Sequence, residues 1–187
     1  MMTKVMPMAM MPVSDTARAV LRPKNALSTQ DVAWSLEARP TPEGDAVEIE
    51  VAYTGLNFRD VMVAFGILDE DLLSGGLTRA AFGFECSGTV TRVGPDCRDF
   101  APGDRVMAFT SGAFASNVVA APAHVQKVPD GLSLEEAATI PVAFATAWYA
   151  LEEAGRLRTG DRVLIHGAVG AVGMAAIQIA RRRGATV

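Results

Sequence analysis

The sequence has few of the residues that build disulfide frameworks or metal centres. Its 187 residues include two cysteines and two histidines. The cysteines, Cys86 and Cys97, form neither a C-x-x-C motif nor a paired framework. Isolated thiols of this kind stay reduced in a reducing compartment, so no disulfide is expected.

Long apolar runs and an excess of positive charge are also missing. No apolar segment approaches the length of a membrane span, and Pro7 and Pro12 interrupt the methionine-rich start, which argues against a signal peptide. The formal net charge of −4 favours neither nucleic acid nor an anionic membrane as a partner. We therefore expect a cytoplasmic protein in which residues 1–16 form a disordered leader.

Hydrophobic residues, at 50% of the chain, are sufficient for a packed core. From residue 17 to 128 the pattern is mainly β, because short alternating or apolar runs are separated by turn residues. A half-buried strand is predicted over 47–54, where Glu48 and Glu50 alternate with apolar residues. Further strands are predicted over 84–93, 105–109, 114–121 and 125–128. This pattern is typical of a small β-barrel domain, interrupted by a helical turn over 57–65.

After Pro129 the pattern becomes helical. Ser133 and Glu136 have the spacing of a capping box and predict a short helix, which Pro141 ends or kinks. The apolar run over residues 142–154 then predicts a helix, and Gly155 directly after it marks the end of that helix. We place a second domain over residues 129–187.

The most informative stretch covers residues 160–187. An apolar strand (161–166), a glycine-punctuated turn and an apolar helix (174–183) follow one another there. Gly170 lets the backbone approach a phosphate, and Gly173 lets the helix pack closely. The helix N-terminus supplies N–H groups for an anion. The turn therefore predicts a dinucleotide pyrophosphate site, although Ala168 replaces the first glycine of G-x-G-x-x-G; the alternative is a tight connection without a ligand.

Four motifs in this order resemble the medium-chain dehydrogenase/reductase superfamily. They are the runs 55–60 (GLNFRD), 83–90 (GFECSGTV) and 102–106 (PGDRV), and the glycine turn. The family joins an N-terminal GroES-like β-barrel domain to a Rossmann domain. The resemblance thus implies a mixed α/β fold, with the GroES-like domain over 17–128 and only the first part of a Rossmann domain over 129–187.

Zinc-dependent members of that superfamily carry a cysteine ligand in the segment aligned with 56–60, and a histidine aligned with Phe84. This sequence has neither, and its two cysteines cannot form the four-cysteine structural zinc lobe. The resemblance therefore implies a zinc-free member with no metal ligand.

Residues 55–60 and 140–151 are similar to enoyl reductase domains of polyketide synthases and animal-type fatty acid synthases. The resemblance implies an oxidoreductase that transfers hydride from NADPH to the β-carbon of an α,β-unsaturated thioester on an acyl carrier protein. Other synthase domains would be partners, and a homodimer is left open. The alternatives are a free-standing NADPH:quinone oxidoreductase-like enzyme and an inactive, truncated fragment.

The resemblance also implies roles for six residues. Two of them, Asn57 and Thr146, would lie near the nicotinamide as catalytic and cofactor-binding residues. The pyrophosphate would be lined by Gly170, Ala171, Val172 and Gly173. The alternative for Asn57 is a role in turn geometry, and the alternative for Thr146 is a hydroxyl bonded to its own helix.

Other polar residues near these motifs receive structural roles or none. For Arg59 and Asp60 we favour a local ion pair that orders the loop, and we expect His166 to pack at the end of its strand. Glu85 is a strand carboxylate without an assigned role. Leu68 stands where many polyketide enoyl reductases carry a tyrosine proton donor, which leaves the proton source open.

Overall fold

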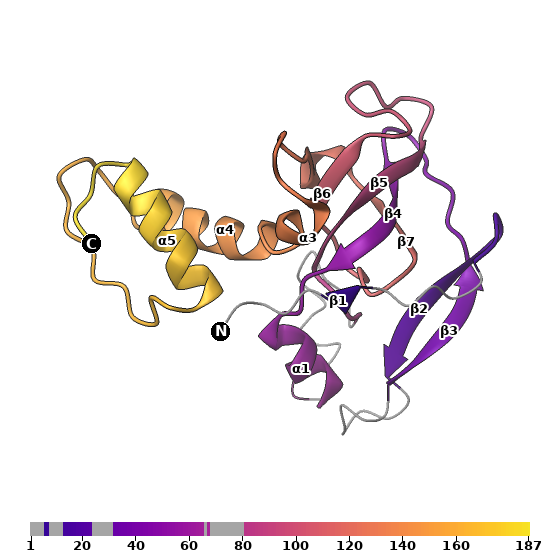
Figure 1. Cartoon of the computed structure of the whole chain (residues 1–187), viewed down its shortest axis with the longest axis horizontal. Coiled ribbons are helices and arrows are strands. Elements are labelled where there is room, and N and C mark those ends of the chain that lie inside the picture. Colours follow the sequence, from indigo (N-terminus) through magenta and orange to yellow (C-terminus); the bar gives the residue numbers. More distant parts are fainter. Residues whose placement is uncertain (1–5, 8–12, 24–31, 66, 68–80) are drawn as a thin grey trace. The chain divides into compact units, whose positions relative to one another are not determined.

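The computed structural model describes residues 6–7, 13–23, 32–65, 67 and 81–187 (Figure 1). The chain divides into two compact units, residues 4–139 and 140–187. The predicted mixed α/β class is confirmed, since the first unit is built on an antiparallel sheet and the second on helices. None of the described helices has the length and apolar character needed to span a membrane.

The units divide later than the sequence-based domain boundary at 128/129. The short helix α3 (Leu134–Ala137) belongs to the first unit. Its capping box is present as predicted, with the Ser133 hydroxyl accepting a hydrogen bond of 3.1 Å from the N–H of Glu136. The Ser87 hydroxyl donates to the carbonyl oxygen of Leu134, which ties α3 to the sheet.

The main sheet of the first unit contains six strands in the order β1-β4-β5-β6-β8, with β7 also paired to β4. All pairings are antiparallel. The strands are β1 (Met6–Pro7), β4 (Val47–Thr54), β5 (Glu85–Val93), β6 (Arg105–Phe109), β7 (Asn117–Ala120) and β8 (Val125–Lys127). The five strands predicted within residues 17–128 are therefore present, with β7 shorter than the predicted 114–121. A single turn of 3-10 helix, η1 (Pro122–His124), precedes β8.

A second, two-stranded sheet joins β2 (Ala17–Pro23) to β3 (Val32–Ala38). The Arg22 guanidinium donates to Glu37 across this hairpin at 2.7 and 2.8 Å. An isolated bridge pairs Val20 with Ala115, and the N–H of Leu21 donates to the Phe114 carbonyl oxygen at 2.8 Å. The hairpin is thereby connected to the loop before β7.

The apolar core of this unit is built mainly from residues of its strands. Its centre is formed by Val47, Ile49, Cys86, Val90, Val106 and Val118. Glu48, which the alternation of β4 placed on the exposed face, is instead completely buried, with 0% of its surface exposed. A buried carboxylate is costly unless it is paired, so its partners explain the difference.

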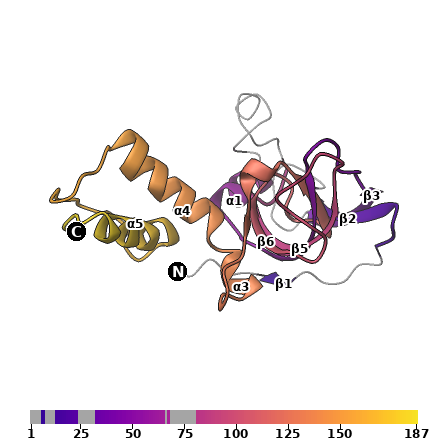
Figure 2. The same ribbon diagram turned by 90° about the horizontal axis from the view of Figure 1, so that it is seen from above.

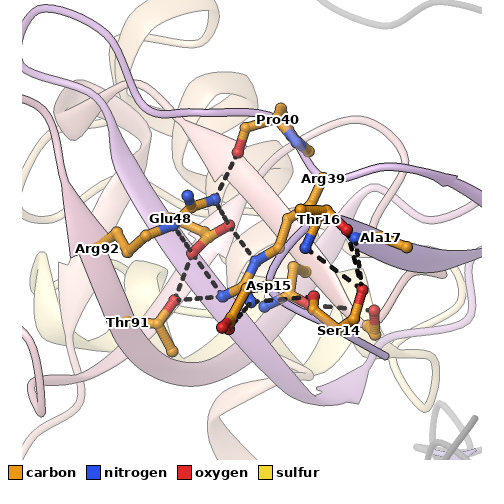
Figure 3. A network of polar contacts seen from close by, with 11 residues as sticks. Ser14, Asp15, Thr16, Ala17, Arg39, Pro40, Glu48, Thr91 and Arg92 are labelled. Atoms are coloured by element: carbon orange, nitrogen blue, oxygen red, sulfur yellow. Dashed lines mark hydrogen bonds and ion pairs between the residues drawn. The ribbon is translucent and has the colours of Figure 1, made fainter. Parts of the chain in front are cut away.

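Three donors surround the Glu48 carboxylate (Figure 3). Arg39 donates to both of its oxygens at 2.9 Å, Arg92 donates at 2.6 and 2.7 Å, and the Thr91 hydroxyl donates at 2.7 Å. Burial raises the pKa of Glu48, but these hydrogen bonds outweigh burial and lower its pKa to about 2. The carboxylate thus joins β4, β5 and the segment after β3.

Two parts of the segment predicted as a disordered leader, residues 1–16, contact this unit; that the leader is disordered stays a prediction. Met6 and Pro7 pair with Thr54 and Tyr53 at the end of β4. Asp15 lies 3.8 Å from the Arg39 guanidinium, in a partly exposed ion pair. Residues 1–5 and 8–12 of the leader lie outside the described residues.

The second unit consists of α4 (Pro141–Trp148), a π-helical turn η2 (Tyr149–Ala154) and α5 (Ala171–Arg182). Pro141 does not end the preceding helix; it begins α4, where its missing N–H costs nothing. Figures 1 and 2 both show α4 and α5 packed side by side. The contact is made by small residues, chiefly Ala143, Ala147, Ala175 and Ala176.

The strand predicted over 161–166 is reduced to a single parallel bridge between Arg162 and Thr186. Leu164 is 83% exposed, although its position in an apolar run suggested a buried strand. A parallel strand is stabilised by neighbours on its edges and by helices on its faces. Within the described residues, segment 161–166 has only the stretch around Thr186 as a β partner, so the ladder does not extend.

Candidate functional site

The glycine turn forms the N-terminus of α5. Gly167 adopts a φ of +71°, a conformation that side chains disfavour. Gly170 is the N-cap, with extended backbone (φ −82°, ψ 166°), and α5 begins one residue later. A side chain on Gly173 would collide with the carbonyl oxygen of Gly167. The first turn of the helix therefore packs directly on the glycine turn, as its sequence predicted.

The first amides of α5 have no acceptors inside the helix, as at the start of any α-helix. The N–H of Met174 is the first to bond four residues back, to the Gly170 carbonyl oxygen at 2.9 Å, so the N–H groups of 171–173 precede the helical ladder. A Cβ built on Gly170 meets only the Gly167 carbonyl oxygen, at 3.4 Å. Unpaired amides, a positive helix end and a bare Gly170 fit the pyrophosphate of a dinucleotide.

The side chains beside this turn point outward. Val169 is 79% exposed, and Val172 and His166 are also exposed. The expectation that His166 packs at a strand end is wrong, because the strand that would place it there is not formed.

The loop around Asn57 is the second candidate site, in the first unit. Asn57 directly precedes α1 (Phe58–Ala64), and its backbone N–H donates to Asp60 Oδ2 at 2.8 Å. Asp60 Oδ1 accepts a second bond, of 2.7 Å, from the N–H of Gly83. Asp60 is 3% exposed; burial raises its pKa, and the two N–H groups oppose that shift. Asp60 thus fixes the start of α1 against the segment before β5.

The side chain of Asn57 is held by a different carboxylate. Its Nδ2 donates to Glu85 Oε1 at 3.0 Å and lies 3.5 Å from the carbonyl oxygen of Gly55. Glu85 begins β5 and is 2% exposed. Sequence analysis gave Glu85 no role, and the only signal was a carboxylate within the otherwise apolar and small run 83–88.

Arg59 and Asp60 do not form the local ion pair that we expected. The Arg59 guanidinium lies over the ring of Phe84, 4.5 Å from its centre, whereas Asp60 bonds to backbone N–H groups. Asp60 still orders the loop, but through the main chain. Phe84 itself is buried.

The other predicted site residues are placed as follows. Thr146 is exposed on α4 and belongs to the second unit, whereas Asn57 belongs to the first. Leu68 lies outside the described residues. The described part of the chain contains no group of three or more His, Cys, Asp or Glu side chains suited to a metal ion; that the protein functions without a metal stays a prediction.

Comparison with known proteins places these features in a family. Residues 43–130 match the alcohol dehydrogenase GroES-like domain. The chain is 48% identical over 141 residues to erythronolide synthase EryA2 of Saccharopolyspora erythraea, which covers 75% of this chain and 4% of that protein.

Two solved structures extend the comparison to nearly the whole chain. The CurK enoyl reductase is 38% identical, with a TM-score of 0.84 over 90% of this chain and 52% of the other. A quinone oxidoreductase from Pseudomonas syringae pv. Tomato DC3000 is 28% identical, with a TM-score of 0.74 over 90% of this chain and 51% of the other. The chain thus spans about half the length of these structures and a small part of the synthase.

Proposed function

The chain belongs to the medium-chain dehydrogenase/reductase superfamily, and on that basis we propose that it forms part of an enoyl reductase of polyketide or fatty acid synthesis. The similarity to a polyketide synthase and to the CurK enoyl reductase supports this assignment over other oxidoreductases. The observation that carries it is the set of N–H groups at 171–173 that precede the helical ladder of α5, beside Gly170, where an added Cβ would meet only the Gly167 carbonyl oxygen.

NADPH, when bound, supplies the hydride that reduces the β-carbon of an α,β-unsaturated thioester. The residues Gly170, Ala171, Val172 and Gly173 would hold the pyrophosphate through backbone N–H groups. A side chain at 170 or 173 would reduce the space for the phosphates or push the helix away. The choice of NADPH over NADH rests on the family likeness.

Asn57 and Thr146 would contact the nicotinamide end of the cofactor. Asn57 is suited to this role because Asp60 fixes its backbone and Glu85 fixes its side chain. Hydride addition places negative charge on the thioester oxygen, which hydrogen-bond donors must stabilise. The α-carbon then takes a proton, whose donor we leave unassigned.

The substrate would be an enoyl group attached to an acyl carrier protein, and the physical partners would be other domains of a synthase. The synthase relatives support this proposal, because each is a much longer protein that matches the chain over a small part of its length. A cytoplasmic location fits the same setting. A homodimer remains an expectation from the family.

The test is the consumption of NADPH by the purified protein, followed by the absorbance of the reduced nicotinamide. With a crotonyl thioester as acceptor we expect turnover that depends on both reactants. The matched control is G173V, which the glycine turn should not accommodate. A wild-type protein that oxidises NADPH no faster with the thioester than without it would contradict the proposal.

A free-standing quinone oxidoreductase-like enzyme is the second candidate, supported by the quinone oxidoreductase structures among the neighbours. A quinone offered in place of the thioester distinguishes the two, since the better acceptor identifies the function. A third reading, an inactive fragment, predicts that NADPH leaves the thermal melt unchanged, because a ligand that binds the folded state raises its stability.

A further inference from the structure

Two buried carboxylates bind Asn57, one at its backbone and the other at its side chain. Asp60 accepts the backbone N–H of Asn57, and Glu85 accepts its side-chain amide. The side chain of Asn57 also takes part in a capping box with the N–H of Asp60, which uses one of the two lone pairs of its carbonyl oxygen, Oδ1. We propose that Glu85 is a positioning residue that fixes the amide of Asn57 so that the other lone pair of Oδ1 is presented to the ligand as an acceptor. This inference rests on the proposed function, which places Asn57 beside the cofactor.

The two ends of an asparagine amide have opposite hydrogen-bonding character. Nδ2 carries two donors, and Oδ1 offers only acceptors. Among the described residues, Nδ2 of Asn57 has two hydrogen-bond partners, both acceptors: Glu85 Oε1 at 3.0 Å and the Gly55 carbonyl oxygen at 3.5 Å. A flipped amide would direct Oδ1 at a carboxylate and a carbonyl oxygen, which repel it. The amide therefore has one favoured orientation.

Burial strengthens this preference. Glu85 is 2% exposed, so water cannot readily take over the hydrogen bond to Asn57 or screen the charge. Hydrogen bonds to an ionised acceptor are also stronger than those between neutral groups. An oriented Asn57 is thus part of the folded structure and does not need the ligand to set it.

Gly55 leaves the space that the carboxylate occupies. A Cβ built on Gly55 would collide with Glu85, its nearest atoms being Oε1, Cγ and Cδ of that side chain. Gly55 has no positive φ, so an alanine there adds no backbone strain. The variant G55A should therefore displace the Glu85 carboxylate while leaving both Glu85 and Asn57 chemically unchanged.

The orientation predicts which ligand group Asn57 recognises. An acceptor suits a hydrogen-bond donor, such as the N–H of a primary carboxamide, and it is unsuited to stabilising negative charge on a thioester oxygen. The chemical class of the contacted group is therefore an amide N–H of the nicotinamide. The donors that stabilise the developing oxyanion must come from elsewhere.

The first test is the affinity of the purified protein for NADPH in E85Q and G55A, each made alone and combined with N57A. A glutamine at 85 offers either end of an amide, so Asn57 is no longer oriented. We expect either change to weaken NADPH binding roughly tenfold when Asn57 is present, and less than about twofold in the N57A background. E50Q, a matched change at an exposed position of the neighbouring strand β4, should have no effect.

Equal losses in the two backgrounds would overturn the proposal, because Glu85 would then act through the fold and not through Asn57. Unchanged binding in both E85Q and G55A would overturn it as well. Thermal melts of every variant identify changes that merely unfold the protein. Because two chemically different changes displace the same interaction, one of them can fail to fold without ending the test.

The second test needs no cofactor. The side-chain NH2 of Asn57, followed by NMR in protein labelled with ¹⁵N-asparagine, should exchange slowly with water in the wild type and in E50Q. It should exchange faster in E85Q and G55A. A wild type that does not bind NADPH would contradict the proposed function, while the exchange rates would still decide whether Glu85 fixes the amide.

Discussion

Gly173 packs so closely on Gly167 that a side chain at 173 would collide with the carbonyl oxygen of residue 167. The contact joins the first turn of α5 to the glycine turn before it. It also sets where the N–H groups of 171–173 point, since the helix axis follows from this packing. Close packing alone therefore requires glycine at position 173, whether or not a ligand is bound.

Replacing Gly173 by alanine should destabilise the second unit. The new methyl group meets main-chain atoms that cannot rotate away, so α5 must shift, and we expect a loss of about 1–3 kcal/mol in the free energy of unfolding. Thermal or urea unfolding, followed by circular dichroism, measures it.

Gly170 provides the matched control for this prediction. Its backbone is extended and an added Cβ makes only ordinary contact, at 3.4 Å. G170A should therefore keep the stability of the wild type while weakening NADPH binding, because the methyl group stands where the phosphates approach. If G173A and G170A destabilised the protein equally, the close contact of Gly173 with Gly167 would not account for the effect of G173A.

The Glu48 network predicts a loss of stability in acid. Its pKa falls from an ordinary value of 4.5 to about 2 in the folded protein, so the unfolded state takes up the proton first as the pH drops. The stabilisation is complete above the ordinary pKa and is lost as the pH falls toward about 2, amounting to about 3 kcal/mol. Urea unfolding over this pH range measures the effect.

The control separates Glu48 from the other carboxylates. E48Q should be less stable than the wild type near neutral pH and should lose less stability on acidification, because it lacks this titration. E50Q removes an exposed carboxylate from the same strand and should keep the wild-type pH dependence. The same dependence in E48Q as in the wild type would contradict the assignment to Glu48.

Local patterns were sufficient to predict much of the fold. β6 begins and ends at the predicted residues, and the capping box at Ser133 is formed, because these signals depend on neighbours in sequence. Glu48 was misplaced because its partners Arg39 and Arg92 come from distant segments, and alternation alone assigns a carboxylate to the exposed face. The prediction of a strand over 161–166 was wrong for a related reason, because a parallel strand depends on partner strands that the periodicity of its own sequence does not reveal.

The candidate site was predictable in its residue types but not in its connections. The glycine spacing indicated a close helix contact, which the collision at Gly173 supports. The bond between Asn57 and Glu85 joins residues 28 positions apart, and no local pattern links them. Asp60 was expected to pair with its neighbour Arg59, whereas the folded loop gives it two backbone N–H groups.

Asp60 should not tolerate its amide isostere. Both of its oxygens accept a hydrogen bond from a backbone N–H, one from Asn57 and one from Gly83. In D60N the new NH2 would face one of these donors, which leaves that buried N–H unpaired. We expect a loss of about 1–3 kcal/mol in unfolding free energy, measured by urea titration. D99N, at an exposed position, is the control and should be neutral.

The two thiols should differ in reactivity. Burial, with a smaller contribution from the charge of Glu85, raises the pKa of Cys86 to about 12, and the thiolate is the reactive form. Cys97 is only half-buried. A thiol reagent at about pH 8 should therefore modify Cys97 alone in the native protein, and both cysteines after denaturation; mass spectrometry of the digested protein identifies the modified sites. Rapid native labelling of Cys86 would contradict its burial.

The π-helical turn η2 has a consequence for insertions and deletions in this segment. The N–H of Gly155 bonds five residues back, to Ala150 at 2.8 Å, so the turn accommodates one residue more than an α-helical turn. Removing a single residue between 149 and 151 would restore α-helical spacing and rotate the residues after the deletion by roughly 100°. Glu152 would then face away from Arg183, its ion-pair partner at the end of α5. The extra residue thus sets the rotation of η2 that turns Glu152 toward Arg183.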